Sequence, residues 1–258
     1  MINILDIPLF SGTLDEAVLG VLHICCEGGP KLNRCISATG AHGLVYATEN
    51  KDFREVLRSF YLNLPDGMPC VWVGRIKGAK DMERCYGPDF FKNVMICTAD
   101  KNIKHYLCGG KEGVAHELKD VIENRFGNSR IVGLYCPPFR EMTEGEMKAL
   151  VYDIQSKNTD IVWIGLSTPK QEFFAKKLSS FLKVHCIISV GAAFDFHTGK
   201  VRQAPKFIQR LGLEWFFRLL MEPRRLYKRY FKVVPTFFFY AIMDIIKNNG
   251  QHIKEHNV

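Results

Sequence analysis

Short apolar runs alternate with longer amphipathic segments up to about residue 190 of this chain. The apolar runs, bounded by turn residues, predict β-strands at residues 2–7, 34–38, 104–108, 130–135, 160–164 and 185–190. Apolar positions with helical spacing predict α-helices at residues 14–26, 52–62, 68–76, 90–98, 114–125, 144–156 and 170–182. Strands alternating with such helices predict an α/β fold: a mainly parallel, Rossmann-like sheet with helices on both faces.

The pattern changes after about residue 200. Residues 207–221 are rich in large apolar side chains with arginines among them, and residues 226–243 mix aromatic and basic side chains. We therefore expect an α/β catalytic core at residues 1–199 and a helical, basic, aromatic-rich C-terminal appendage at residues 200–258. The apolar run at residues 233–243 is too short to span a bilayer, so the appendage is predicted to lie at a membrane surface.

The distribution of charge supports this division. The 258-residue chain has a formal net charge of +8, and residues 200–232 hold ten Lys and Arg but two acidic residues. The rest of the chain is therefore formally neutral. Basic and aromatic residues mixed in one stretch favour an anionic membrane surface. A nucleic-acid-binding module is the alternative interpretation, but an aromatic-rich tail fits lipid better, and we expect no nucleic-acid partner.

Cysteine spacing and acidic motifs give no sign of a metal site. The nine cysteines form no CxxC pair, which predicts buried thiols in a reducing cytosol. There is no Asp-x-Asp motif to hold a metal-bound nucleotide diphosphate. Asp195-Phe196-His197 supplies half of a metal site at most, and a buried, hydrogen-bonded pair explains it better. The first ten residues lack a basic segment, so we expect no signal peptide.

Two junctions between a strand-like and a helix-like run carry candidate chemistry, because ligands bind at the carboxyl edge of open α/β sheets. Pro65-Asp66-Gly67-Met68-Pro69 places a carboxylate there. Asp66 is a candidate general base, and an Asp-Gly turn explains it equally well. Thr168-Pro169-Lys170-Gln171 predicts a helix start in which Thr168 and Gln171 form a capping box. The same amide groups could face a phosphate.

Two glycine-containing loops also follow predicted strands. Gly109 and Gly110 let the backbone approach an anion closely, although a tight turn explains them as well. The segment Thr39-Gly40-Ala41-His42-Gly43 follows another strand. Neither loop has the GxGxxG pattern, which argues against a nucleotide-dependent oxidoreductase, the alternative enzyme class. Farther along, Arg218, Arg225 and Lys228 would share one face of a continuous helix that Pro223 could break.

Six motifs in a fixed order resemble the WecG/TagA/CpsF family of glycosyltransferases. They are PDGMP, YGPD, GG..G, GLSTPKQE, GAAFDFHTGKVRQAP and GLEWFFRLLMEPRR, and the resemblance runs from about residue 5 to residue 229. It implies an inverting, metal-independent enzyme without a cofactor. Such enzymes transfer a sugar from a nucleotide diphosphate, usually UDP, to a polyprenol-diphosphate-linked sugar at the cytoplasmic membrane face. The protein is then expected to be cytoplasmic and peripheral at that membrane.

The resemblance also implies roles for individual residues. Asp66 would be the catalytic base. The substrate-binding positions would be Thr39, His42, Gly109, Gly110, Thr168, Gln171, Arg218, Arg225 and Lys228. Many members that transfer N-acetylmannosamine have Thr-x-Asn where this chain has Thr39-Gly40-Ala41. The Thr-Gly-x-His-Gly form resembles a subgroup serving exopolysaccharide or O-antigen assembly, so hexose donors such as UDP-glucose or UDP-galactose stay open beside N-acetylmannosamine.

Overall fold

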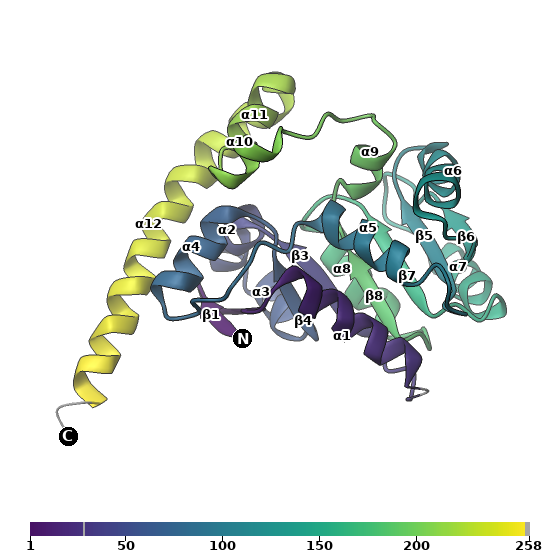
Figure 1. The fold of residues 1–258 in the computed structure, drawn as a ribbon, viewed down its shortest axis with the longest axis horizontal. Helices are drawn as coiled ribbons and strands as arrows, with labels where there is room; N and C mark the ends of the chain where they lie inside the picture. Colours follow the sequence, from purple (N-terminus) through teal and green to yellow (C-terminus); the bar gives the residue numbers. More distant parts are fainter. Residues whose placement is uncertain (28, 256–258) are drawn as a thin grey trace.

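The computed structural model describes residues 1–27 and 29–255 and confirms the α/β fold (Figure 1). Six parallel strands form one sheet in the order β4-β3-β8-β7-β5-β6. They are β3 (Arg34–Thr39), β4 (Leu62–Pro65), β5 (His105–Gly109), β6 (Ile131–Tyr135), β7 (Ile161–Gly165) and β8 (Cys186–Ser189). Because every strand points the same way, all six carboxyl ends meet at one edge of the sheet.

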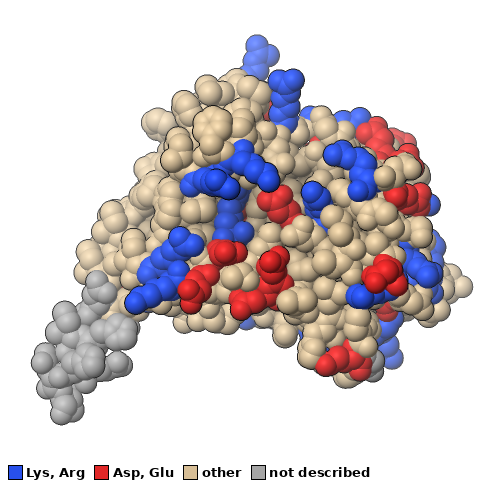
Figure 2. Space-filling model, viewed as in Figure 1, with Lys and Arg blue, Asp and Glu red and all other residues tan. Residues whose placement is uncertain are grey.

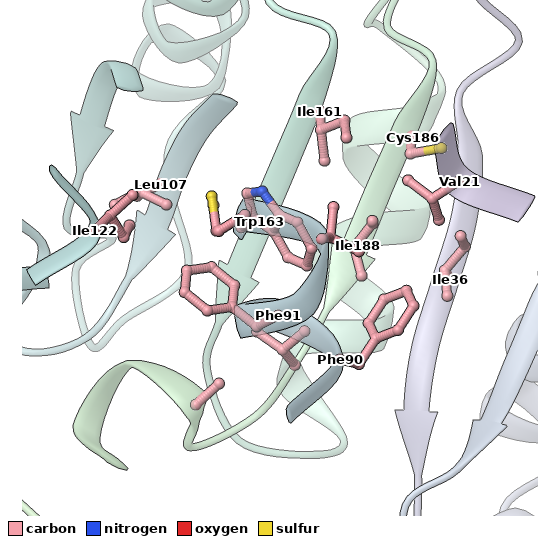
Figure 3. Close-up of a cluster of buried hydrophobic side chains, with 14 of the residues drawn as sticks. Val21, Ile36, Phe90, Phe91, Leu107, Ile122, Ile161, Trp163, Cys186 and Ile188 are labelled. Carbon is pink, nitrogen blue, oxygen red and sulfur yellow. The ribbon is translucent and has the colours of Figure 1, made fainter. Parts of the chain in front are cut away.

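Helices cover both faces of this sheet, as the apolar pattern predicts. One face packs against α1 (Leu14–Cys26), α5 (Gly87–Cys97), α6 (Val114–Phe126) and α9 (Ala193–His197). The other packs against α7 (Glu144–Ser156) and α8 (Lys170–Ser179). Successive side chains of β7 point to opposite faces, so Trp163 enters the first core and Val162 the second. Figure 3 shows Trp163 beside Phe91, with ring centroids 4.8 Å apart.

The N-terminal strand prediction was wrong in its placement. Residues 2–9 form a separate antiparallel hairpin of β1 (Ile2–Ile4) and β2 (Ile7–Leu9). Leu5 and Asp6 turn the chain with φ angles of 51° and 63°. These left-handed conformations suit a two-residue hairpin turn, which ends the strand after three residues.

Three further elements differ from the predicted pattern. The prediction missed β4, which is four residues long, and placed its first residue in a helix. That helix is the shorter α3 (Lys51–Arg58). The prediction also missed α2 (Ala41–Glu49), which begins directly after β3. By contrast, α4 (Met68–Ile76) has the predicted bounds.

The C-terminal appendage is helical and packs on the core. It contains α10 (Lys206–Arg210), α11 (Glu214–Met221) and α12 (Pro223–Glu255). The chain does break near Pro223, which stands at the start of α12, where a proline is tolerated. Figure 1 shows α12 running past α2 and α4, and Val233, Phe237 and Ala241 are buried there. No helix in the described part of the chain is both long and apolar enough to cross a bilayer.

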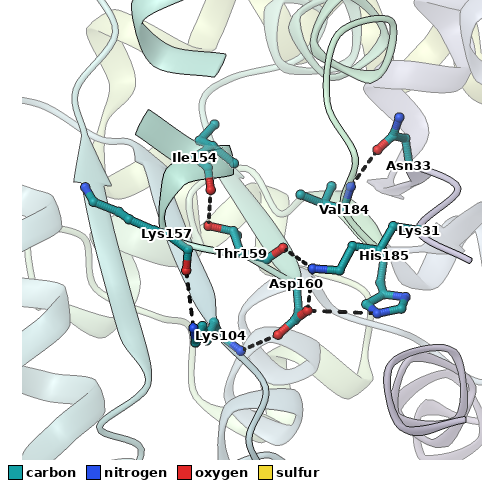
Figure 4. A network of polar contacts seen from close by, with 9 residues as sticks. All are labelled: Lys31, Asn33, Lys104, Ile154, Lys157, Thr159, Asp160, Val184 and His185. Carbon is teal, nitrogen blue, oxygen red and sulfur yellow. Dashed lines mark hydrogen bonds and ion pairs between the residues drawn. The ribbon is translucent and has the colours of Figure 1, made fainter. Parts of the chain in front are cut away.

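A polar network ties the strands together at the amino edge of the sheet (Figure 4). Asp160 precedes β7, accepts a hydrogen bond of 2.9 Å from the backbone N–H of Lys104 and pairs with Lys31 at 2.9 Å. His185, which precedes β8, lies 3.9 Å from the same carboxylate. The amino edge of the sheet is thus filled by structural contacts, whereas a cavity lies at the carboxyl edge.

Candidate functional site

A cavity of about 1120 Å³ lies at the carboxyl edge of the sheet, between the strand ends and the appendage. Its core side is formed by residues that directly follow the strands, such as Gly40, Asp66, Gly110, Leu166 and Val190. Its other side is formed by α11 and α12. The cavity therefore occupies the place where the topology of a parallel sheet predicts a ligand.

Asp66 leaves the end of β4 and faces this cavity. Its Oδ1 accepts a hydrogen bond of 2.7 Å from the N–H of Gly87, at the start of α5. A Cβ at Gly87 would stand 2.9 Å from the carbonyl oxygen of Val190, so this close approach requires glycine. Burial raises the pKa of Asp66 to about 6, although the positive charge of Arg84 opposes the shift. A carboxyl group with this pKa can accept a proton near neutral pH.

Arg84 connects the backbone of Asp66 to the appendage. Its Nε donates to the carbonyl oxygen of Asp66 at 2.6 Å, and its Nη1 donates to Gln209 of α10 at 3.1 Å. Its Nη2 binds Glu214, the first residue of α11. The guanidinium carbon also lies 3.9 Å from the ring centroid of Tyr86. This one side chain therefore joins the strand end to two helices of the appendage.

The segment before α8 is built differently from the predicted capping box. The residue before the helix is Pro169, which follows a cis peptide bond, and it makes no side-chain cap. Thr168 instead donates to Glu172 Oε1 at 2.9 Å. Gln171 donates to the same oxygen at 2.8 Å and accepts from the N–H of Gly191 at 2.9 Å. Thr168 and Gln171 do line the cavity, and Gln171 links α8 to the loop after β8.

The glycine-containing loops place only some of their residues in the cavity. Gly110 and His42 line it, whereas Thr39 and Gly109 do not. Thr39 is buried at the end of β3. Gly109 packs on the neighbouring strand, where a Cβ would stand 2.6 Å from the carbonyl oxygen of Gly165. Burial, together with the charge of Arg229, lowers the pKa of His42 to about 4, so its imidazole is neutral at neutral pH.

Three arginines of the appendage face the cavity: Arg218 of α11, and Arg225 and Arg229 of α12. Burial lowers the pKa of Arg229; the phenol group of Tyr230 opposes this shift, and the charges of the neighbouring Arg225 and Arg218 add to it. Arg218 Nε is buried without a hydrogen-bond partner among the described residues. Lys228 does not line the cavity and is exposed. Figure 2 shows Lys and Arg gathered below the top end of the appendage.

The candidate half metal site is divided between two environments. Asp195 lines the cavity, where burial raises its pKa and the charge of Arg225 opposes the shift. His197 lies against Phe91 and Phe126 and has Nε2 2.9 Å from the carbonyl oxygen of Pro88. Within the described ranges, no group of three or more His, Cys, Asp or Glu side chains is placed to hold a metal ion.

The family comparison decides the class of protein. The profile of the "Glycosyl transferase WecG/TagA/CpsF family" matches residues 2–251. This chain belongs to that glycosyltransferase family. One relative is the N-acetylglucosaminyldiphosphoundecaprenol N-acetyl-beta-D-mannosaminyltransferase of Bacillus subtilis (strain 168). The two are 29% identical over 195 residues, which is 76% of this chain and 74% of the relative.

A second relative is the enzyme of the same name from Bacillus spizizenii (strain ATCC 23059 / NRRL B-14472 / W23). It is 29% identical over 182 residues, 69% of this chain and 68% of the relative. The resemblance drawn from the six motifs is therefore confirmed, and so is the expectation of a glycosyltransferase. The oxidoreductase and the nucleic-acid-binding module lose their support.

In this WecG/TagA/CpsF protein, sequence analysis missed several residues of the cavity. They are Arg84, Tyr86, Lys111, Glu214 and Arg229. Arg229 carried a usable signal, since it follows Arg225 by four positions and therefore shares its helix face. Glu214 stands inside the GLEWFFRLL motif but was interpreted only as part of the basic segment. Arg84 carried no signal, because it lies in a loop between two elements with no periodicity to follow.

Proposed function

We propose that this protein is an inverting, metal-independent glycosyltransferase. It moves a sugar from a UDP-sugar to a polyprenol-diphosphate-linked sugar in the assembly of a bacterial cell-surface polysaccharide. The observation that carries the proposal is the pairing across one cavity of Asp66, a carboxyl group with a pKa of about 6, and the arginines of the appendage. Both relatives are named as enzymes that act on N-acetylglucosaminyldiphosphoundecaprenol. Their names support a polyprenol-diphosphate-linked sugar as the acceptor of this protein.

Asp66 is the general base of the proposed reaction. It takes the proton of an acceptor hydroxyl as the hydroxyl oxygen forms a bond to the anomeric carbon of the donor. The bond between that carbon and the UDP oxygen breaks with both electrons leaving on UDP. Because the oxygen attacks from the face opposite UDP, the configuration at the anomeric carbon is inverted.

Positive side chains stabilise the charge that develops on departing UDP. Arg218 and Arg225, joined by Arg229 and Lys111, supply this charge from around the cavity. The buried Nε of Arg218, which has no hydrogen-bond partner within residues 1–27 and 29–255, is a donor that an anion would satisfy. Gly110 lets a phosphate approach the backbone, and Thr168 and Gln171 hold the loop before α8 at the cavity wall.

The remaining predicted binding residues differ in their position relative to the cavity. His42 lines the cavity beside Ala41 and is the proposed contact to the donor sugar. Thr39 and Gly109 support the cavity from beneath as neighbours of Gly40 and Gly110. The role of Lys228 rests on the resemblance alone, and its exposed position suits a contact to the membrane.

The acceptor's lipid places the protein at the inner face of the cell membrane. Basic residues are most frequent between residues 200 and 232, and several apolar side chains of the appendage face solvent. Phe231 is 86% exposed and Phe239 is 61% exposed. A surface that combines exposed aromatic rings with cations binds anionic lipid without a spanning helix.

A donor screen tests this function. Purified protein is incubated with a polyprenyl-diphosphate-linked N-acetylglucosamine and, in turn, UDP-glucose, UDP-galactose and UDP-N-acetylmannosamine, and products are read by mass spectrometry. One donor should give a product, with inverted anomeric configuration by NMR, and excess EDTA should leave the rate within about twofold. Asp66→Asn should lower turnover by about 10²–10⁴-fold at unchanged melting temperature.

Three results would count against the proposal. Absence of product with every donor would refute the substrate class. Loss of activity in EDTA that Mg²⁺ or Mn²⁺ restores would refute metal independence, and Asp195 would be the first ligand to examine. Near-normal turnover of Asp66→Asn would refute its role as base.

A further inference from the structure

Glu214 is the acidic residue through which the appendage contacts the loop around Asp66. Both of its carboxylate oxygens have core partners. Oε1 accepts a hydrogen bond of 2.6 Å from the hydroxyl of Tyr86, and Oε2 accepts from Arg84. The side chains of Arg84 and Glu214 are 13% and 12% exposed, so this contact is largely removed from water. A largely buried ion pair with a second hydrogen bond fixes geometry far better than an exposed pair.

Of the two core partners of Glu214, one binds Asp66 and the other directly precedes a residue that does. Arg84 Nε donates to the Asp66 carbonyl oxygen at 2.6 Å. Tyr86 directly precedes Gly87, whose N–H donates to Asp66 Oδ1 at 2.7 Å. One carboxylate on α11 thus contacts Arg84, which binds the Asp66 backbone, and Tyr86, which directly precedes the glycine that binds the Asp66 carboxylate. No other side-chain carboxylate that lines the cavity makes a described hydrogen bond to either Arg84 or Tyr86.

We propose that Glu214 is a positioning residue for Asp66: when α11 docks, Glu214 orients Arg84 and Tyr86 so that the Asp66 carboxylate faces the acceptor hydroxyl. The catalytic base is then complete only when the appendage covers the cavity. Proton transfer is thereby linked to the closed arrangement, in which water is excluded. This inference rests on the proposed role of Asp66 as general base.

The electrostatics of the site give the inference a measurable signature. Some charged and titratable groups change the pKa of Asp66, and others have their own pKa changed by the charge of Asp66. These groups come from α4, from the loop before α5 and from α11. They are Cys70, Arg84, Cys85, Tyr86, Glu214 and Arg218. The negative charge of Glu214 raises the pKa of Asp66, while Arg84 and Arg218 lower it. Removing the charge of Glu214 should therefore lower the pKa of Asp66, because the negative neighbour would be lost while the positive charges of Arg84 and Arg218 would remain.

Glu214→Gln is the main test variant, since it keeps the shape and removes the charge. Two measurements are made on the full-length protein. Hydrogen–deuterium exchange without substrate should show faster exchange in residues 206–221. The pH profile of turnover with a short-chain polyprenyl-diphosphate acceptor should show a loss of about tenfold and an acid limb at lower pH. Tyr86→Phe removes one hydrogen bond and keeps the charge of Glu214, so it should speed exchange and lower the rate by less, with the acid limb unmoved.

Glu49→Gln is the matched control. Glu49 also pairs with the appendage, at 2.7 Å from Lys232, but at an exposed position away from the cavity. It should leave both measurements within error of the wild type. The inference would be overturned if Glu214→Gln had the acid limb and the hydrogen–deuterium exchange rates of the wild type. It would also be overturned if turnover of Glu214→Gln fell while its acid limb stayed at the same pH. Because exchange is measured without turnover, failure of this inference is distinguishable from failure of the proposed function.

Discussion

At the scale of single residues, three donors converge on one oxygen of buried Glu172, while its other oxygen has no hydrogen-bond partner in the described part of the chain. Burial raises the pKa of this carboxyl group, although the hydrogen bonds from Gln171, Thr168 and Ser37 oppose the shift. A carboxyl group whose pKa is higher in the folded state contributes stability that is lost as pH rises through that value. Glu172 should therefore make the protein less stable at higher pH.

Glu172→Gln tests this, because it keeps an acceptor for the three donors and cannot ionise. As pH rises from about 4.5, the ordinary pKa of a glutamate, towards neutral, the free energy of unfolding of the wild type should fall relative to that of the variant, as measured by urea denaturation. Glu146→Gln is a control, since its partner Arg140 holds the pKa of Glu146 at about 2 and it stays ionised throughout. Parallel pH dependence in the wild type and Glu172→Gln would contradict the expectation.

Asp66 should give the enzyme an acid limb in its pH profile. If Asp66 is the base, kcat/KM should fall as pH drops through about 6, where this carboxyl group becomes protonated. His42, with a pKa of about 4, should not contribute in this range. Asp195→Asn removes the other cavity carboxyl group with a raised pKa. Two results together would assign the acid limb to Asp195 instead of Asp66. The limb would move in Asp195→Asn, and the residual activity of Asp66→Asn would still show it.

At the scale of elements, α12 has one face against the core and one toward solvent. Phe237 is 2% exposed and packs with the hairpin, α2 and α4, whereas Phe239, two residues on, is 61% exposed. Phe237→Ala should lower the free energy of unfolding by about 3–5 kcal/mol through loss of buried surface and the cavity left behind. Phe239→Ala should change stability little and weaken binding to vesicles that contain anionic lipid.

The two phenylalanine variants are controls for each other, measured by thermal unfolding and by vesicle co-sedimentation. Equal loss of stability in both would mean that the helix does not present these two faces. If the double variant with Phe239→Ala and Phe231→Ala bound vesicles as well as the wild type, these two side chains would not form the membrane contact.

At the scale of the whole molecule, the appendage is both a cover for the core and the proposed membrane contact. Removing residues 200–258 should abolish binding to anionic vesicles, since each basic residue near such a surface contributes about 1 kcal/mol. It should also lower the melting temperature, because Val233, Phe237 and Ala241 leave the core. Residues 1–199 therefore stand as a proposed catalytic unit that the appendage stabilises by packing on it.

A charge variant separates these two effects. Arg224→Glu with Lys228→Glu changes two exposed positions outside the cavity and leaves the packed face of α12 intact. It should weaken vesicle binding, most clearly at low salt, at an unchanged melting temperature. Full vesicle binding by the truncated protein would refute the membrane role of the appendage.

Much of the fold follows from local pattern. Five strands of the sheet, β3 and β5 to β8, are short apolar runs. Most helices have an apolar face whose residues recur at helical spacing. Elements were misjudged where the local pattern is weak. The hairpin reads as one strand because its turn is made by Leu5 and Asp6 rather than glycine. The strand β4 has only four residues, and its apolar character merges with the helix before it.

For the site, the sequence by itself determined the family, a carboxylate just ahead of the helix at residues 68–76 and the supply of basic residues in the appendage. These are properties of residue type and order. The tertiary structure alone decided which of them meet: Arg229 rather than Lys228 faces the cavity, and Thr39 and Gly109 lie beneath it. It also brought Glu214 to Arg84 and Tyr86 across 130 and 128 positions of chain. Such contacts depend on how α11 and α12 lie on the sheet edge, and no local periodicity encodes that placement.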